Sequence, residues 1–338
     1  MTELAKDLLE WFEDNGRKNL PWQSSPPNIY HIWLSEIMLQ QTQVTTVISY
    51  FNNFIANFPD IKSLAIADDD KVMSAWAGLG YYSRARNLHK TAKIINSKYG
   101  GILPTNFDQI LSLPGIGPST AGAILSLGSD IGMPILDGNV KRVLARYYRV
   151  EGHYSNSSVM RELWRLAALN TPQTKNAKYT QAIMDIGAIV CTPKNPSCSD
   201  CPISSHCGAF LNEEQALYPS KKKGGSSKPE KSIALLIYTN EKNEIFLKKK
   251  PDQGIWGGLW SFEECQDIES TISKTIKKHN NNASVIRRLK AFKHTFTHYN
   301  LYISPILVDS PGGHENYFHK SYHLKGLPAP VTKIIQAL

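Results

Sequence analysis

The spacing of apolar residues predicts helices along the first two thirds of the chain. Residues 3–15 place Leu4, Leu8 and Phe12 on one helical face. Helical spacing resumes at Tyr30, is interrupted near Gln40, and then continues to residue 58. Further helical patterns lie near residues 85–95, 138–149, 158–170 and 178–190, and no stretch before residue 220 reads convincingly as a strand.

The pattern changes after residue 218. Residues 219–230 combine Pro, Gly, Ser and Lys, which predicts a flexible basic linker. Beyond it, strand-like runs lie at 233–238, 245–247, 289–296 and 302–308, with helical patterns near 266–278 and 330–337. We therefore expect an all-α domain over residues 1–218, a linker over 219–230, and a smaller α+β domain over 231–338.

Composition and charge indicate which broad class of protein this sequence belongs to. Of the 338 residues, 41% are hydrophobic and 20% are charged, which is typical of a soluble globular protein. The N-terminus has early acids and no apolar segment, so we expect no signal peptide, no membrane partner and a cytoplasmic location. The net charge is +9, whereas residues 1–218 hold 19 Lys and Arg against 19 Asp and Glu, so the excess lies further along the chain. A basic excess favours polyanionic partners, and an ordinary soluble surface is equally compatible with an excess of this size.

A Gly-x-Gly turn separates two helical patterns at Leu-Pro-Gly-Ile-Gly-Pro-Ser, residues 113–119. Gly117 is expected to permit a tight turn with positive φ, and Pro118 and Ser119 suit the first positions of a new helix. The N–H groups of such a hairpin, including those near Gly115, can hold a phosphate beside a helix N-terminus. A simple turn between two helices is the alternative.

Two acids stand in opposite surroundings. Glu36 is the lone acid in a strongly apolar helical stretch, where burial would raise its pKa and keep the proton that a general acid needs. Asp137 stands at a helix start, where N–H groups favour the ionised form; helix capping alone would also explain it. Two acids with pKa values pushed apart suit the cleavage of a glycosidic bond.

Four of the five cysteines lie in one short segment, separated by six, two and five residues. Such a loop can hold a [4Fe-4S] cluster, and zinc is the chemical alternative, although only one Cys-x₂-Cys pair occurs. Cys265 lies apart and is read as an ordinary thiol. The predicted cluster ligands are Cys191, Cys198, Cys201 and Cys207.

The Gly-x-Gly hairpin followed by Asp137 resembles the helix-hairpin-helix DNA glycosylase superfamily. Residues 33–44, Trp-Leu-Ser-Glu-Ile-Met-Leu-Gln-Gln-Thr-Gln-Val, are similar to the segment of the MutY adenine glycosylases that carries the general acid. Residues 17–22, 78–87 and 135–146 match the same family. The resemblance implies a helix-hairpin-helix glycosylase domain with a [4Fe-4S] loop, which excises adenine from duplex DNA where it pairs with 8-oxoguanine or guanine, as a monomer.

The resemblance also implies roles for individual residues. Glu36 would protonate adenine, and Asp137, with Asn139 nearby, would stabilise the sugar cation or a covalent intermediate. Gln41 and Tyr81 would wedge into the duplex, although core packing is the plain alternative for Tyr81. The hairpin residues and one lysine would contact DNA: Gly115, Gly117, Ser119 and Lys141.

Ser119 bears on the type of reaction. Relatives similar to endonuclease III carry a nucleophilic lysine at this hairpin position and cleave the strand through a Schiff base, which a hydroxyl cannot form. Ser119 therefore favours a monofunctional glycosylase. Lys141 follows Asp137 by one helical turn and would react weakly with an abasic sugar, or simply pair with phosphate or with Asp137.

The C-terminal part resembles a Nudix fold. Residues 254–262 look like its start, whereas residues 270–276 lack the Glu-rich helix that holds Mg²⁺, so we expect a recognition domain without hydrolase activity. Phe296, Thr297 and His298 resemble the Phe-Ser-His loop with which MutY proteins sense 8-oxoguanine.

Two other functions fit parts of the sequence. A glycosylase for oxidised pyrimidines with lyase activity is opposed by Ser119 and by the C-terminal domain. A DNA-binding module without activity is opposed by the presence of both Glu36 and Asp137.

Overall fold

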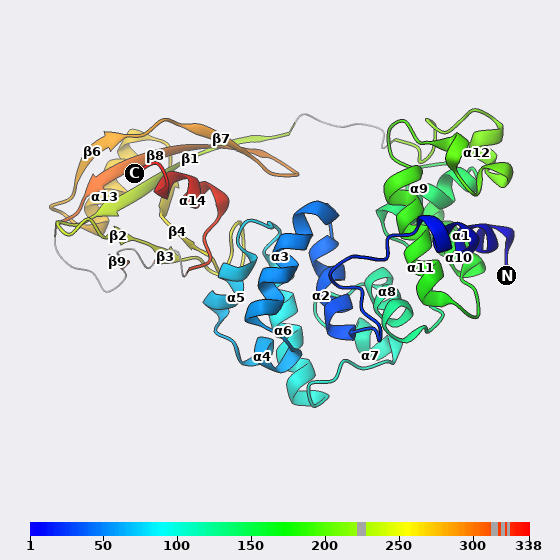
Figure 1. Cartoon of the computed structure of the whole chain (residues 1–338). Coiled ribbons are helices and arrows are strands. Elements are labelled where there is room, and N and C mark those ends of the chain that lie inside the picture. The colour runs from blue at the N-terminus through cyan, green and yellow to red at the C-terminus, as the bar shows by residue number, and fades with distance from the viewer. Residues whose placement is uncertain (222–227, 312–316, 319–321, 323–324) are drawn as a thin grey trace. The chain divides into compact units, whose positions relative to one another are not determined.

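The computed structural model describes residues 1–221, 228–311, 317–318, 322 and 325–338, and these form two compact units (Figure 1). The first unit comprises Met1–Ala65 and Lys90–Gly225, and the second comprises Ile66–His89 and Ser226–Leu338. The division expected at 1–218, 219–230 and 231–338 stays a prediction, and the structure groups residues 66–89 with the C-terminal part. Residues 222–227 of the expected linker lie outside the described residues.

Helices form the first unit, as the apolar spacing predicts. Two short segments, α5 and the beginning of α6, belong to the second unit instead. The helices before the linker are α1 (Glu3–Asn15), α2 (Ile29–Leu39), α3 (Val44–Asn57), α4 (Ile61–Ile66), α5 (Asp69–Trp76), α6 (Ser83–Lys98), α7 (Phe107–Leu111), α8 (Pro118–Ser129), α9 (Gly138–Tyr147), α10 (Ser157–Asn170), α11 (Asn176–Asp185) and α12 (Gly208–Leu211). A π-helical turn, η1 (Ile186–Val190), continues α11, and two 3₁₀ turns follow, η2 (Cys198–Asp200) and η3 (Ser204–His206).

The apolar face predicted for the first helix is buried. Leu4, Leu8 and Phe12 of α1 join a core with the apolar residues of α9, α10 and α11. Burying a side chain of this size contributes ~1.5–3 kcal/mol. Trp33 and Leu34 of α2 are also fully buried, which fixes the helix that carries Glu36.

A mixed sheet forms the core of the second unit. Its strand order is β6-β8-β1-β2-β9, with β5 paired to β1 and β7 to β8. The central pair β1 and β8 is parallel, with Ile233 opposite Ile303, and the other pairs are antiparallel. The strands of this sheet are β1 (Glu230–Thr239), β2 (Ile245–Phe246), β5 (Glu263–Gln266), β6 (Ser284–Arg288), β7 (Phe292–Thr295), β8 (Asn300–Asp309) and β9 (Tyr317–Phe318).

Further elements complete the second unit. A two-stranded sheet pairs β3 (Lys248–Lys249) with β4 (Trp260–Ser261). Helix α13 (Glu269–His279) buries Ile272 and Ile276 against the larger sheet, and α14 (Ala329–Ile335) lies near the C-terminus. The α+β prediction for this region is confirmed. The sequence pattern missed β6, because all its residues are exposed and it therefore lacks apolar alternation.

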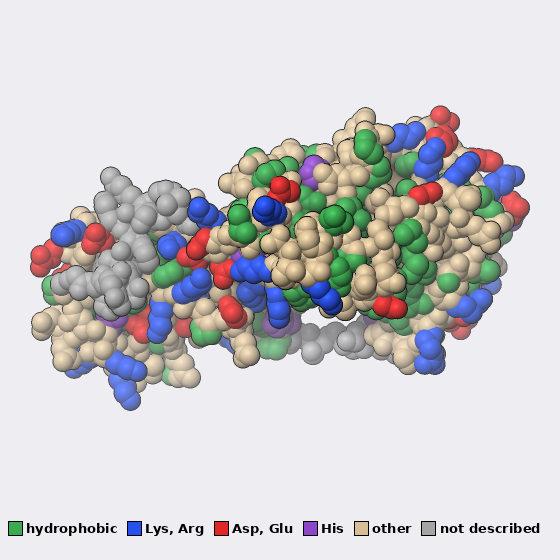
Figure 2. All heavy atoms as spheres, turned by 90° about the horizontal axis from the view of Figure 1, so that it is seen from below, with side chains coloured by type: hydrophobic (Ala, Val, Ile, Leu, Met, Phe, Trp, Pro, Cys, Tyr) green, Lys and Arg blue, Asp and Glu red, His purple; other side chains and the backbone are tan. Residues whose placement is uncertain are grey.

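Two global features bear on possible partners. Within the described ranges, no helix is both long and apolar enough to span a membrane. On the face shown in Figure 2, Lys and Arg side chains gather in several groups between acidic ones. This distribution suits a protein with a modest net positive charge.

Candidate active site

Glu36 and Asp137 line the same cavity of the first unit. The cavity has a volume of about 760 Å³, within the range of ~300–1,000 Å³ typical of small-molecule sites. Its walls come from α2, the loop after it, and the starts of α8 and α9, together with α11. The other residues predicted for the site that line it are Gln41, Ser119 and Asn139.

Glu36 is placed by a helix whose other faces are buried. The Asn28 side chain caps α2 by accepting hydrogen bonds from the Tyr30 and His31 N–H groups, and Ser35 and Ile37 are buried on either side of Glu36. Burial, and then the charge of Asp137, raise the pKa of Glu36 to about 8. The carboxyl group therefore carries a proton at neutral pH, as the apolar sequence around it predicts.

Asp137 caps α9, and its Oδ1 accepts a hydrogen bond from the Val140 N–H at 2.7 Å. The expectation that the helix start would lower its pKa is wrong, because burial outweighs the other effects and raises the pKa. Hydrogen bonds from the Val140 and Asn139 N–H groups and the charges of Arg142 and Lys141 oppose that rise. The two acids thus line one cavity, in which both are desolvated. Asp137 caps α9 and faces this cavity at the same time.

The hairpin before α8 differs from the prediction in one torsion angle. Gly117 is the N-cap of α8 with an ordinary φ of −93°, and Gly115 holds the left-handed turn with a φ of 80°. The turn is thus made two residues earlier, and Pro118 occupies the first turn of the helix as predicted. The Ser119 hydroxyl accepts a hydrogen bond from the Leu136 N–H at 2.9 Å, which ties this helix start to the residue before Asp137.

Arg142 connects Asn139 to the cysteine loop. Its guanidinium donates hydrogen bonds to Asn139 Oδ1 at 2.9 Å, to the Gly187 carbonyl at 2.6 Å and to the Cys191 carbonyl at 2.7 Å. One helix, α9, therefore carries Asp137 at its start and an arginine that reaches the cysteine segment. Lys141 instead places its Nζ 5.4 Å from the ring centroid of Tyr154 and does not line the cavity.

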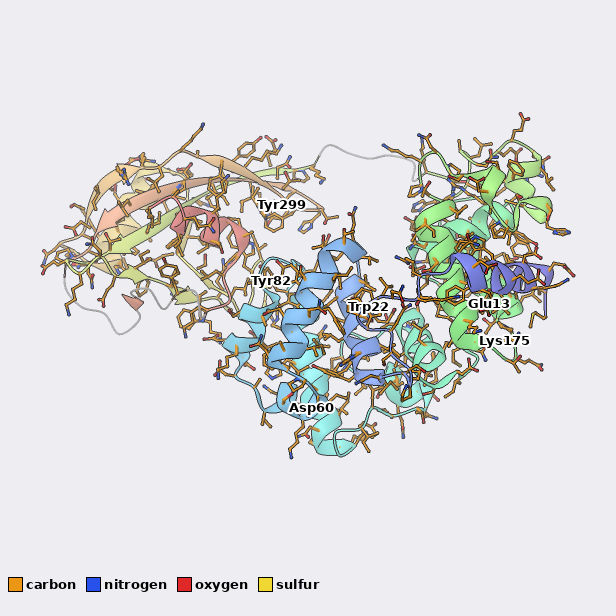
Figure 3. The ribbon with its side chains drawn as sticks, viewed as in Figure 1. Glu13, Trp22, Asp60, Tyr82, Lys175 and Tyr299 are labelled. Carbon is orange, nitrogen blue, oxygen red and sulfur yellow. The ribbon has the colours of Figure 1, made fainter. Side chains whose placement is uncertain are left out.

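A buried ion pair at the cavity was not predicted. Asp185 is fully buried and accepts hydrogen bonds from Arg17 Nη2 at 2.6 Å and from Gln181 Nε2 at 2.8 Å. Arg17, Gln181 and Trp22 (Figure 3) line the cavity. The sequence does carry a signal for Asp185. Like Glu36, it is a lone acid in an apolar helical run.

Both predicted wedge residues have left-handed backbones. Gln41 follows α2, is exposed and has a φ of 58°. Tyr81 lies in the second unit, has a φ of 48° and is 45% exposed. Such conformations cost ~1–3 kcal/mol in residues other than glycine and gather at functional sites. The exposure of Tyr81 excludes the alternative of core packing.

The Phe-Thr-His loop lies beside Tyr81 within the second unit. The hydroxyl oxygens of Tyr81 and Thr297 are 2.7 Å apart and share a hydrogen bond. Phe296 stacks on Tyr299 with 4.7 Å between ring centroids, and His298 meets the same ring at 4.8 Å. Aromatic packing therefore holds the loop while its polar groups remain at the surface.

The four predicted ligands, Cys191, Cys198, Cys201 and Cys207, line one cavity. In the described part of the chain, no three Cys, His, Asp or Glu side chains converge closely enough for a single metal ion. A zinc ion would need its sulfur ligands at about 2.3 Å, whereas a cluster with four irons offers each cysteine its own iron. Arg146 Nη1 also donates a hydrogen bond to Cys191 Sγ at 3.3 Å, which joins α9 to this cysteine loop. This donor set fits a [4Fe-4S] cluster.

Three families match successive parts of this chain. Residues 34–168 match the HhH-GPD superfamily of base excision DNA repair proteins, and residues 234–337 match the NUDIX domain. Residues 191–207, the cysteine segment, match the iron-sulfur binding domain of endonuclease III.

Curated relatives match along the whole chain. Adenine DNA glycosylases of Buchnera aphidicola subsp. Schizaphis graminum and subsp. Acyrthosiphon pisum are 42% and 43% identical to it. Each alignment covers 97% of this chain and 95% or more of the relative.

Solved structures match the helical part. A thermostable thymine-DNA glycosylase is 27% identical, with a TM-score of 0.55 over 62% of this chain and 95% of that one. An endonuclease III–DNA complex has a TM-score of 0.53 at 18% identity, over 62% of this chain and 94% of that one, and shows the fold alone. The predicted helix-hairpin-helix fold, iron–sulfur loop and Nudix-like domain are confirmed.

The cysteine geometry leads to a first prediction. Cys198→Ser should lose the cluster's visible absorbance and much of the soluble yield together, because the loop is held by metal bonds. Absorbance and iron content of the purified variant measure this. Cys265→Ser, outside the loop, is the matched control and should keep both. Wild-type protein with zinc and no iron would contradict the assignment.

Proposed function

Because this chain belongs to the adenine DNA glycosylases of base excision repair, we propose that it removes adenine paired with 8-oxoguanine or guanine. We further propose that it is monofunctional. The observation that supports this proposal most is the pair of acids in one cavity, with the pKa of Glu36 at about 8. An assay on duplex DNA, with and without alkali, tests it: strand breaks should require alkali.

The two acids have complementary tasks in the proposed reaction. Glu36 donates its proton to a ring nitrogen of adenine, so the electrons of the broken C–N bond leave with a neutral base. The sugar carbon becomes positively charged, and the Asp137 carboxylate faces that charge. Asn139, held by Arg142, lies beside this sugar, and water completes the hydrolysis.

Residues of both units contribute contacts to DNA in this proposal. The N–H groups at Gly115 and Gly117 bind phosphate, and Ser119 lies next to them. Gln41 and Tyr81 wedge into the duplex to offset the flipping cost of a few kcal/mol. Lys141 supports the backbone contact. The protein acts as a monomer in the cytoplasm, where it binds the chromosomal DNA.

The iron–sulfur loop has a structural role in this proposal. Cys191, Cys198, Cys201 and Cys207 would hold the [4Fe-4S] cluster, whose iron–sulfur bonds fasten the segment that Arg142 joins to Asn139. No step of the reaction passes through it.

A second prediction tests the acid pair. Glu36→Gln and Asp137→Asn should each lower single-turnover excision by about a hundred- to ten-thousandfold, the range for acid–base groups, while DNA binding is largely kept. Glu13→Gln, at an exposed ion pair with Lys178, is the control. Near wild-type excision by either variant would contradict the mechanism.

The pH dependence gives the same test a second readout. Burial raises the pKa of Glu36 to about 8, so the active proton is present below that pH and lost above it. Wild-type excision should therefore fall as the pH rises through about 8. Glu36→Gln should lose this descending limb.

A third prediction concerns strand cleavage. Ser119→Lys should introduce cleavage without alkali, since an amine at this place can form an imine with the sugar. Borohydride trapping measures the covalent complex. Ser119→Ala is the control, because it also removes the acceptor of the Leu136 N–H without adding an amine. Absence of a trapped complex with the lysine variant would count against the placement of Ser119 beside the sugar.

A fourth prediction concerns damage recognition. A Thr297→Ala, His298→Ala double variant should lose roughly ten- to a hundredfold of its preference for adenine opposite 8-oxoguanine over guanine, as base-edge contacts are worth ~1–3 kcal/mol. Its rate on saturating substrate should fall much less than that of Glu36→Gln. Thr295→Ala, whose hydroxyl bonds Asn300, is the control. Full preference in the double variant would leave Gln41 and Tyr81 as the sensors.

A further inference from the structure

Asp70 joins an early segment of the chain to the C-terminal domain. It lies in the first turn of α5, and its side chain is only 16% exposed. Its carboxylate accepts hydrogen bonds from Lys249 Nζ at 2.8 Å, from Lys325 Nζ at 3.0 Å and from Trp260 Nε1 at 3.0 Å. All three donors come from the C-terminal part of the second unit. A carboxylate with two ammonium partners and an indole donor makes strong, charge-assisted contacts.

The other end of the same segment is also attached. Arg86, in the first turns of α6, donates a hydrogen bond to the Gly257 carbonyl. Tyr82, labelled in Figure 3, donates to the Leu327 carbonyl at 3.4 Å. A Cβ atom on Gly326 would lie 2.7 Å from the Met73 Cβ, so the backbone passes very close to α5 there. Residues 66–89 thus pack on the C-terminal domain along their length.

The loop between these two attachments carries Tyr81. Gly78, Gly80 and Tyr81 have φ values of 101°, 73° and 48°, and few residues favour such a backbone by themselves. Thr297 reaches Tyr81 in the middle of this loop, at 2.7 Å between the hydroxyl oxygens. An exposed hydrogen bond of this kind contributes little alone. Its geometry therefore depends on contacts that fix the loop from outside.

We infer that Asp70 is a positioning residue that holds the Tyr81 loop against Thr297, so that wedge and damage sensor act as one rigid DNA-reading surface. Asp70 touches neither DNA nor the reacting atoms in this role. Asp70 holds the start of α5 against the C-terminal domain. Arg86 holds the start of α6, just after the Tyr81 loop, against the same domain. The inference rests on the proposed recognition of 8-oxoguanine through Tyr81 and Thr297.

The charge state of Asp70 is compatible with that role. Burial alone would raise its pKa, but hydrogen bonds from Lys249, Trp260 and Lys325 outweigh burial and hold the pKa below its ordinary value. The group is therefore ionised at neutral pH. Its contribution to stability is present above its unfolded pKa and is lost as the pH falls through the lower folded pKa.

The experiment compares Asp70→Ala with Asp108→Asn in the full-length protein. Asp108 occupies the corresponding position in the first turn of α7, is exposed, and serves as the matched control. Hydrogen exchange over residues 78–86 reports the loop, and single-turnover rates on adenine opposite 8-oxoguanine or guanine report the preference. Lys249→Met removes one of the two ammonium partners of Asp70. It tests the same contact if Asp70→Ala fails to fold.

Asp70→Ala and Lys249→Met should each speed exchange over residues 78–86 and reduce the base preference by roughly five- to tenfold, a typical coupling between sites. Their excision rate on saturating substrate should stay near wild type, which a general loss of folding would not allow. Asp108→Asn should change nothing. The inference would be overturned if Asp70→Ala and Lys249→Met exchanged hydrogen over residues 78–86 at the wild-type rate. It would also be overturned if they exchanged faster but kept the full preference for adenine opposite 8-oxoguanine. If the wild-type protein itself showed no preference for 8-oxoguanine over guanine, the proposed recognition of 8-oxoguanine would be refuted instead. Hydrogen exchange would then still show whether Asp70 holds the Tyr81 loop.

Discussion

The start of α9 is the constraint on which the rest of the site depends. Asp137 caps the helix, Ser119 holds the preceding Leu136 N–H, and Arg142 bonds both Asn139 and the carbonyl of Cys191. These contacts tie the hairpin, Asp137 and the cysteine loop to one helix end. A shift of this helix would therefore disturb all three features together.

Burial sets the chemistry of the acids more strongly than local hydrogen bonding does. The N–H groups at the start of α9 favour the charged form of Asp137, yet desolvation in the shared cavity raises its pKa. The same desolvation, strengthened by the neighbouring charge of Asp137, raises the pKa of Glu36 to about 8. Asp185 is also buried, and it forms an ion pair with the Arg17 guanidinium at 2.6 Å. Among the described residues, no ion pair of this kind is found for Glu36, the acid with the raised pKa.

The second unit combines segments that lie far apart in the sequence. Residues 66–89 pack on the Nudix-like domain through Asp70 and Arg86, although the helices on either side of them belong to the first unit. The Tyr81 loop is consequently shaped by residues of both segments. Exposed hydroxyl groups such as those of Tyr81 and Thr297 gain a defined geometry only because the backbone beneath them is fixed from both sides.

Local sequence patterns were sufficient to predict most of the helices and the residues that form the candidate site and the cysteine loop. Apolar spacing located the helices, the lone acid identified Glu36, and the four close cysteines predicted the cluster loop, because each signal lies within a few neighbouring residues. Features that depend on contacts between distant segments became visible only in the folded chain. Folding brings Glu36 and Asp137 into one cavity, places the positive φ of the hairpin at Gly115 and not at Gly117, and groups residues 66–89 with the C-terminal domain. Desolvation and long-range packing are properties of the folded surroundings, and no local pattern encodes them.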